Sequence, residues 1–430
     1  MAADGLALAA TGGVGLAAAR AVSEARQWDR LMAMARHGAI AEGLGVNRAC
    51  LTPEDRAARR ELIAWTAEIG LSVSVDGMAN LFLRHEGTDP AAAPVLTGSH
   101  MDTQPNGGRF DGIYGVVAAL EAVQAIREAG VATARPIEVV AWTNEEGGRF
   151  APGCMGSMAY AGHKPPHTWD AVADPEGVTF RAALDAHLAA EADLPSRPIG
   201  SPRPHAYVEA HIEQGPRLEA EGLDIGVVTG IQGSRWFLAE LRGETAHAGT
   251  APLSLRRDAV QDMVAAVTAL NALTADPADV LRFTVGRIEV HPNTSNSVAD
   301  LVRFTVDFRH PDRDVLSTVG GAIENTIRGA AKHCDVAVTE RFHALPVEFD
   351  AAVPGAVEAA ARALGLSHMR MPSGAFHDAQ FMVPLCPTGM IFVPCRRGIS
   401  HNPAEYAEPG ALADGTRVLA ATLADLANRG

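Results

Sequence analysis

The feature that most constrains this chain is an ordered series of polar side chains at or just after the ends of strand-like runs. Each is an imidazole or a carboxylate, the side-chain types that bind divalent cations. Ligands of open α/β sheets bind at the carboxyl ends of the strands, so such side chains can converge on one site. A set of this kind can hold two cations around a shared carboxylate, which indicates metal-assisted hydrolysis. The series comprises His100, Asp102, Asp111, Glu145, Glu146, His211 and His401.

The first half of the chain alternates helix and strand patterns. Thr52 is a hydroxyl N-cap ahead of Pro53, and Gly70 is the matching helix stop. Short apolar runs are predicted as buried strands. The alternation, which runs from about residue 24 to residue 229, predicts an α/β fold. Besides the helix from Pro53 to Gly70, we expect a helix over 115–129 and strands over 81–83, 95–97, 137–143 and 207–212.

Residues 230–342 follow a different pattern. Their predicted order is β-α-β-β-α-β, that of a ferredoxin-like unit, with strands over 236–241, 280–290, 301–308 and 336–341 and helices over 256–275 and 315–333. Afterwards the α/β pattern returns, with helices over 355–364 and 412–428 and a strand over 388–393. We therefore predict that residues 1–229 and 343–430 form one α/β domain, into which residues 230–342 are inserted.

The charge balance excludes some classes of function. The 430 residues include 36 Lys and Arg against 51 Asp and Glu, a formal net charge of −15. Nucleic-acid binding needs a basic face, and anionic membranes attract basic segments, so we expect neither partner. No apolar run is long enough to span a bilayer.

The cysteines and the first residues indicate the compartment. Five cysteines without CxxC spacing predict reduced thiols, no thiolate metal site and a cytoplasmic protein. A pair between Cys386 and Cys395 is the alternative. Residues 1–23 are rich in Ala and Gly, but Asp4 and interrupting glycines argue against a signal peptide. We expect this stretch to be a disordered leader.

The first ligand candidates are His100 and Asp111. Asp102 is expected to accept a hydrogen bond from the ring nitrogen of His100 that faces away from a metal. Taken alone, this pair also fits a surface turn. Asp111 lies between glycines that allow close backbone approach, and each of its oxygens could bind one of two cations. A plain glycine-rich turn is the other interpretation.

Glu145 and Glu146 are adjacent acids after a hydrophobic strand, and they repel each other unless a cation lies nearby. If Glu146 binds a metal, Glu145 can act as general base and return the proton to the leaving nitrogen. A solvated acidic turn is the alternative. His211 and His401 offer neutral imidazoles, which bind Zn, Mn, Co and Ni. A lone histidine is more often structural, but the whole series at strand ends favours a metal site.

Six segments, in order, resemble the amidase/hydantoinase/carbamoylase family of co-catalytic metallopeptidase-like hydrolases, and the resemblance covers the chain from about residue 24 onward. Members include N-carbamoyl-L-amino-acid hydrolases, allantoate amidohydrolases and β-ureidopropionases. The implied fold is a large mixed-sheet α/β catalytic domain of aminopeptidase type with an inserted ferredoxin-like α+β lid and dimerisation domain. The segments are Gly98–Thr103, Gly107–Gly112, Trp142–Gly147, His211–Gly215, Ala246–Thr250 and Ser400–Pro403.

The resemblance implies two divalent metal ions per subunit, Zn, Mn, Co or Ni, bridged by Asp111. A bridging water would attack the ureido carbon, with Glu145 as general base. The implied ligands are His100, Asp111 and His211 for one ion, and Asp111, Glu146 and His401 for the other.

The resemblance also implies the substrate contacts. Gln214 would contact the ureido group, Asn296 and Arg309 would grip the substrate carboxylate, and His377 would also take part in binding. His247 would reach the active site of a partner in a homodimer and stabilise the developing oxyanion. A surface ion pair is the alternative for Arg309, although a bidentate carboxylate clamp suits a guanidinium.

Two departures from the family pattern affect the substrate more than the reaction. Phe376 stands where the family usually has Gly, and the residues after Asn296 differ from the usual Val-Ile-Pro-Gly. The leading hypothesis is hydrolysis of an N-carbamoyl L-amino acid to the amino acid, CO2 and ammonia. Allantoate or 3-ureidopropionate is the next substrate, followed by a dipeptide. A catalytically silent metal- or ligand-binding protein is disfavoured because Glu145 and every ligand are present.

Overall fold

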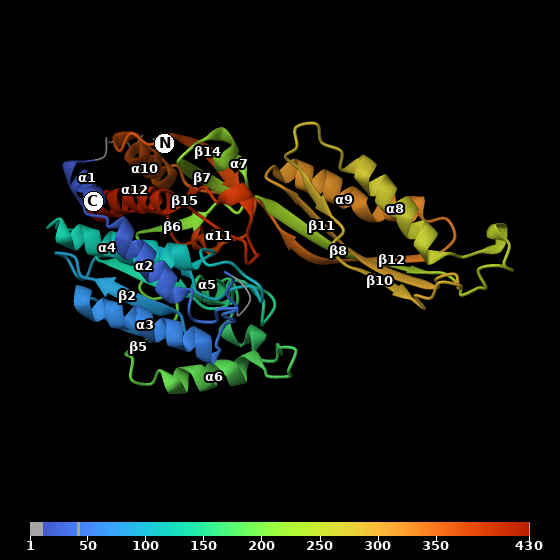
Figure 1. Cartoon of the computed structure of the whole chain (residues 1–430), viewed down its shortest axis with the longest axis horizontal. Helices are drawn as coiled ribbons and strands as arrows, with labels where there is room; N and C mark the ends of the chain where they lie inside the picture. Colours follow the sequence, from blue (N-terminus) through green and yellow to red (C-terminus); the bar gives the residue numbers. More distant parts are fainter. Residues whose placement is uncertain (1–11, 41–43, 430) are drawn as a thin grey trace, which may run out of the picture. The chain divides into compact units, whose positions relative to one another are not determined.

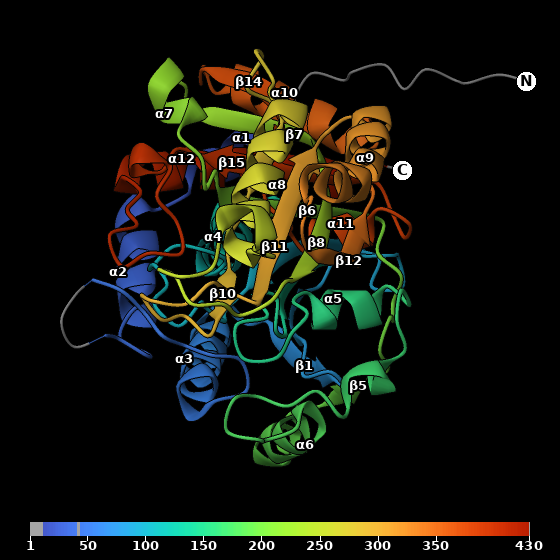
Figure 2. The ribbon, with the colours of Figure 1, turned by 90° about the vertical axis from the view of Figure 1, so that its right-hand side faces the viewer.

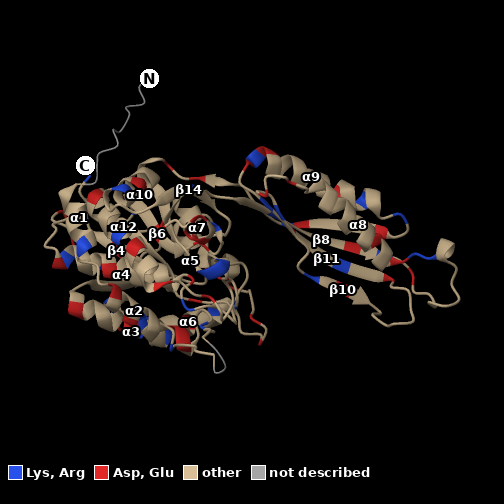
Figure 3. Ribbon diagram, turned by 45° about the horizontal axis from the view of Figure 1, so that its top comes forward, with Lys and Arg blue, Asp and Glu red and all other residues tan. Residues whose placement is uncertain are grey.

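The computed structural model describes residues 12–40 and 44–429. The chain forms two compact units, one made by the residues up to Gly230 and from Glu348 on, the other by Ile231–Val347 (Figure 1). Lys and Arg are interspersed with Asp and Glu along the elements of both units (Figure 3). Among the described helices, none combines the length and apolar character that a membrane span requires.

The first unit is built on a mixed ten-stranded sheet with the order β13-β7-β15-β6-β3-β4-β2-β1-β5, and β14 pairs with β7. Its four central strands, β15, β6, β3 and β4, are mutually parallel, so their carboxyl ends meet at one edge. β2 joins β4 in the antiparallel sense. The strands are β1 (Ser72–Asp76), β2 (Leu81–His85), β3 (Val95–His100), β4 (Ile137–Trp142), β5 (Ser196–Arg197), β6 (Ala206–Ile212), β7 (Ile225–Ile231), β13 (Val347–Glu348), β14 (His368–Ser373) and β15 (Thr388–Val393).

Helices cover both faces of this sheet. On one face α4 and α12 lie side by side across β3 and β6, where Val95, Val208 and Ala210 are buried. On the other face α5 and α11 contact each other, and the Trp142 ring centroid lies 5.2 Å from that of Tyr160. This double burial explains the continuous apolar strands in the sequence. The helices are α1 (Gly13–Arg20), α2 (Glu24–Met34), α3 (Pro53–Ile69), α4 (Ile113–Glu128), α5 (Met155–Tyr160), α6 (Phe180–Ala190), α7 (Arg217–Glu221), α10 (Ala352–Ala363), α11 (Ala379–Met382) and α12 (Pro409–Ala427), with short 3₁₀ turns η1 (Pro166–Trp169) and η3 (Arg396–Gly398).

Local signals act as expected in α3. The Thr52 hydroxyl accepts the backbone N–H of Asp55, and Gly70 ends the helix in the left-handed conformation. The expectation of a disordered leader over 1–23 is wrong for its second half, because α1 packs on α12 with Ala18 and Ala19 fully buried. Residues 1–11 of that stretch lie outside the described residues.

The second unit carries a five-stranded antiparallel sheet with the order β10-β11-β8-β12, and β9 also pairs with β11. Alternate residues of β11 (Val302, Phe304, Val306 and Phe308) are buried on the face that α8 and α9 cover (Figure 2). The chain order of these elements is the ferredoxin-like one. They are β8 (Gly233–Arg242), η2 (Leu253–Leu255), α8 (Ala259–Leu273), β9 (Arg282–Thr284), β10 (Ile288–His291), β11 (Leu301–His310), α9 (Arg313–Ala330) and β12 (Asp335–Ala344).

One predicted strand of this unit is wrong. Residues 280–290 were expected to form a continuous strand, but β9 ends at Thr284 and β10 begins at Ile288. Both pair with β11, where Thr284 opposes Asp307 and Ile288 opposes Phe304. Three residues, including Gly286, therefore face two on the partner, which is a β-bulge.

Candidate metal centre

Parallel strands bring the ligand candidates to one edge of the first unit's sheet. His100 is the last residue of β3, and His211 is the penultimate residue of β6. Glu145 and Glu146 follow the end of β4, while Asp111 lies two residues before α4 begins. The loop after β15 adds His401.

Two groups of potential ligands share Asp111. In the first, Oδ1 of Asp111 lies 3.2 Å from Nε2 of His211 and 3.9 Å from Nε2 of His100, and all three residues are buried. In the second, Oδ2 lies 3.2 Å from Nε2 of His401, which is itself 3.4 Å from Oε2 of Glu146. Within each group the ligand atoms lie within 4.8 Å of one another. Each oxygen of Asp111 thus faces a different group, the geometry that a bridging carboxylate requires.

Backbone carbonyls orient the two buried imidazoles. The Nδ1 atoms of His100 and His211 lie 2.9 Å from the carbonyl oxygens of Asp102 and Ile212. If the Nδ1–H of His100 donates to its carbonyl, Nε2 of His100 keeps its lone pair for a cation, whereas Nε2 of His211 accepts the backbone N–H of Gly112 at 3.2 Å. The expected partner for His100 was the Asp102 carboxylate, but its Oδ1 is 3.8 Å away. Instead, that carboxylate accepts the backbone N–H groups of Glu145 and Glu146.

The electrostatics of the site favour bound cations. Burial, reinforced by the charge of Asp111, raises the pKa of Glu146 to about 8. Burial, with Asp378 and Glu146 nearby, raises the pKa of Glu145 well above its usual value. Desolvation also lowers the pKa of His100 to about 4, so its ring is a neutral ligand. Buried carboxylates are costly without a positive partner, and this mixed oxygen and nitrogen set fits Zn, Mn, Co or Ni.

Glu145 stands beside the two groups without belonging to either. Its Oε2 lies 3.4 Å from Nε2 of His100, and its Oε1 accepts the Cys154 thiol at 3.5 Å. A buried carboxylate next to a cation pair, with one oxygen facing the ligands, is suited to moving a proton.

Four residues at or next to these ligands have strained backbone conformations. Asn144, Cys154, Gln214 and His401 have φ values of 58°, 56°, 55° and 53°, in the left-handed region that non-glycine residues avoid. Each such residue costs about 1–3 kcal/mol and persists only where its surroundings fix it. Strain of this kind gathers at functional sites.

Gln214 and His377 both lie next to the ligands. Nε2 of Gln214 donates to Oδ2 of Asp111 at 3.0 Å. The His377 ring is buried, and its centroid is 4.5 Å from that of His211. His377, His211 and Glu209 form a third possible ligand group. The Glu209 carboxylate, however, already accepts Ser99, Tyr207 and the Ala379 N–H, so the groups around Asp111 are better suited to cations.

The other three predicted residues lie on the second unit. His247 and Asn296 are exposed on adjoining loops, joined by the Ala248 N–H donating to the Asn296 carbonyl at 3.0 Å. Arg309 makes an ion pair with Asp307 at 2.7 Å, which is the alternative considered from the sequence. Roles of these residues toward the metal ligands stay predictions.

Two residues that hold ligands could not be predicted from the sequence. Gln104 donates its backbone N–H and its side-chain amide to the Glu146 carboxylate, at 3.1 and 2.9 Å. Buried Glu405 accepts the backbone N–H of Asp111 at 3.1 Å. No local pattern marks either residue.

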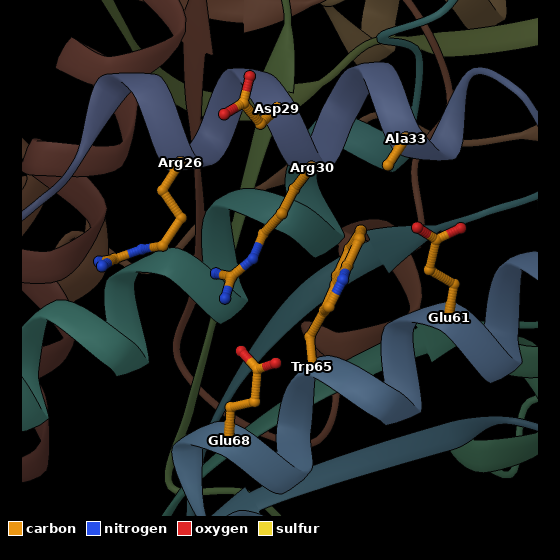
Figure 4. A pocket seen from close by; sticks show the side chains of 7 residues that line it. All are labelled: Arg26, Asp29, Arg30, Ala33, Glu61, Trp65 and Glu68. Atoms are coloured by element: carbon orange, nitrogen blue, oxygen red, sulfur yellow. The ribbon is translucent and has the colours of Figure 1, made fainter.

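A separate surface depression of about 430 Å³ lies between α2 and α3 (Figure 4). Its arginines are already neutralised: Arg26 lies 2.7 Å and Arg30 3.3 Å from buried Glu121. The Arg30 guanidinium also lies over the Trp65 ring. These pairings make the depression a poor candidate for anionic ligands.

Comparisons with known proteins agree with one another. Residues 96–425 match the model of a family described as peptidase family M20/M25/M40. The chain is 41% identical over 391 residues to an N-carbamoyl-L-amino-acid amidohydrolase of Rhizobium meliloti, covering 90% of this chain and 92% of the relative. It is 36% identical over 412 residues to the allantoate amidohydrolase of Escherichia coli, covering 95% and 98%.

Solved structures show the same relationship. An amidase of the hydantoinase/carbamoylase family from Burkholderia multivorans has a TM-score of 0.88 and 43% identity, covering 95% of this chain and 98% of that one. The aminopeptidase PepT of Bacillus cereus has a TM-score of 0.60 at 18% identity, covering 95% and 100%, which shows a shared fold.

Proposed function

The chain belongs to the peptidase family M20/M25/M40, and from this membership we propose that it is a metal-dependent amidohydrolase acting on N-carbamoyl L-amino acids. The products would be the free amino acid, CO2 and ammonia. The observation that carries the proposal is the pair of ligand groups that share Asp111, one oxygen to each. Relatives named N-carbamoyl-L-amino-acid amidohydrolase support the bond that is cleaved.

Two divalent cations, Zn, Mn, Co or Ni, would supply positive charge for the ureido carbonyl oxygen and lower the pKa of a water. The residues around the cations would move the proton and bind the substrate. Glu145 takes the proton from the attacking water and returns it to the amino nitrogen as the C–N bond breaks. The other fragment is carbamic acid, which decomposes to CO2 and ammonia. Cys154 keeps one Glu145 oxygen occupied, leaving the other toward the ligands.

Four further residues are proposed to bind the substrate. Gln214 and His377 lie beside the ligands and are proposed to contact the ureido group and its surroundings. Asn296 and Arg309 are proposed to bind the substrate carboxylate, for which Arg309 must exchange its bond with Asp307. The free thiols of all five cysteines support a reducing, cytoplasmic location.

A panel of substrates tests this function. We expect ammonia release, with Mn, Co, Ni or Zn added, to be most efficient for N-carbamoyl-L-methionine. N-carbamoyl-D-methionine is the matched control, and allantoate and 3-ureidopropionate are competing substrates in the same assay. A dipeptide, whose hydrolysis releases no ammonia, is followed by the free amino acids it yields. A higher kcat/KM on allantoate would identify the protein as an allantoate amidohydrolase. Phe376, half-buried beside His377, would then be the first residue to substitute. No turnover of any of them would contradict the proposal.

The enzyme is further proposed to be a homodimer in which His247 stabilises the oxyanion in the partner's active site. Exposed apolar side chains support a second copy on this unit, because Leu253 and Leu255, soon after His247, are 80% and 77% exposed.

Mixing two inactive variants tests whether His247 of one subunit acts in the active site of the other. A dimer of one Glu145→Gln chain and one His247→Ala chain contains one complete site, so random mixing should restore about a quarter of wild-type activity. A mass tag on one variant would show that chains exchange. Complete exchange without any recovery of activity would exclude the cross-subunit role.

A further inference from the structure

Two loops that are far apart in the sequence meet at one buried carboxylate. Oε1 of Glu405 accepts the backbone N–H groups of Phe110 and Asp111, at 2.8 and 3.1 Å. Its Oε2 accepts the Ser400 hydroxyl at 3.1 Å, one residue before His401. Glu405 is 1% exposed. This carboxylate therefore joins the turn carrying Asp111 to the loop carrying His401.

The same connection runs through Ser400. Its hydroxyl lies 3.1 Å from Oδ2 of Asp111, the oxygen that faces His401. A hydroxyl has one proton, so Ser400 shares it between Asp111 and Glu405. The Gln214 amide donates to both Asp111 and Ser400, at 3.0 and 3.2 Å. Glu405 thus influences the orientation of this Asp111 oxygen indirectly, through the Ser400 hydroxyl.

His401 is the ligand that most needs such support. Its side chain is 50% exposed, whereas that of Asp111 is 4% exposed, and its backbone is in the left-handed conformation. The turn after it is closed by the Glu405 N–H, which donates to the Asn402 carbonyl at 3.0 Å. In the turn that carries Asp111, a Cβ at Gly108 would overlap the Glu405 carboxylate. The two loops are therefore closely packed at this point.

We propose that Glu405 is a positioning residue for the second metal position, the one formed by Asp111, Glu146 and His401. It fixes the distance between the bridging carboxylate and the exposed imidazole, and so sets the affinity of the second ion without contacting it. The inference rests on the proposed function for the existence of that ion. In the first position two of the three ligands, His100 and His211, lie at strand ends, so this position depends less on the loops.

Calorimetric titration of the metal-free, full-length protein with Mn²⁺ tests this role. Wild type is expected to bind two ions. Glu405→Ala should bind the first ion almost normally and the second about 10–100-fold more weakly, the usual effect of losing a group that orients a ligand. Glu405→Gln should restore the second ion, because its amide oxygen accepts both N–H groups and its amide N–H donates to Ser400.

A matched control separates positioning from general destabilisation. Asp262, on the second unit, is a buried carboxylate that accepts two successive backbone N–H groups, those of His333 and Cys334, both at 2.8 Å. Asp262→Ala should lower the melting temperature but keep both ions. Ser400→Ala removes the shared hydroxyl without emptying a buried site. It should weaken binding of the second ion at least about tenfold. This variant replaces Glu405→Ala in the test if Glu405→Ala does not fold.

The outcomes distinguish this inference from the proposed function. If wild type binds two ions and both Glu405→Ala and Ser400→Ala bind them with wild-type affinities, the role of Glu405 is refuted while the metal centre stands. The same holds if Asp262→Ala loses the second ion as Glu405→Ala does. If wild type itself binds one ion or none, the two-metal centre and the inference fail together.

Discussion

Replacing Glu145 by Gln is expected to lower kcat by about 10²–10⁴-fold, the contribution of a positioned general base. The amide keeps the shape of the side chain but cannot take a proton from the attacking water. Since Glu145 belongs to neither ligand group around Asp111, the variant should retain its metal. Steady-state kinetics on N-carbamoyl-L-methionine, with the metal content measured on the same sample, gives both quantities.

The shorter acid provides the control for this substitution. Glu145→Asp keeps a proton acceptor but withdraws it by one methylene group, so we expect activity between that of Glu145→Gln and wild type. The account of Glu145 would be contradicted by a Gln variant that keeps kcat within tenfold of wild type. Loss of metal from that variant would instead identify Glu145 as a ligand.

Replacing Asp111 by Asn is expected to lower the metal affinity of both positions by more than about 100-fold, since even groups that only orient a ligand contribute about 10–100-fold to metal affinity. Oδ1 of Asp111 lies 3.2 Å from His211 and Oδ2 lies 3.2 Å from His401. Asn has a single acceptor oxygen and no charge, so it cannot serve both groups. Dialysis followed by elemental analysis should find little metal, and activity should return only in part at high metal concentration.

Asp102→Asn is the comparison for this variant. Asp102 is buried near the ligands, but its carboxylate holds the backbone N–H groups of Glu145 and Glu146. Its substitution should weaken metal binding less than that of Asp111. Two ions bound tightly by Asp111→Asn would show that this carboxylate is not the bridge.

Local sequence signals predicted the parts of the fold that local energetics decide. The helix from Pro53 is marked at both ends by Thr52 and Gly70, and both caps form as expected. The helix α1 was missed because its buried residues, Ala18 and Ala19, are small and give no apolar periodicity. What orders it is packing on α12, about 400 residues later, and no local pattern reports such a contact.

The same distinction applies to the site. Ligand types at strand ends could be predicted, because parallel strands bring their carboxyl ends to one edge. Glu405 could not, since it contacts Asp111 across 294 residues of sequence. The carboxylate of Asp102 was predicted to accept the hydrogen bond from Nδ1 of His100, but the main-chain carbonyl of Asp102 accepts it instead. Both acceptors belong to the same residue, so the sequence could not distinguish them.

Anomalous diffraction from crystals of the Mn-loaded protein tests the central claim most directly. The account predicts two peaks about 3.5–4 Å apart, one toward His100 and His211 and the other toward Glu146 and His401, with Asp111 between them. A single peak, or a peak beside Glu209 and His377 with none near His401, would contradict it.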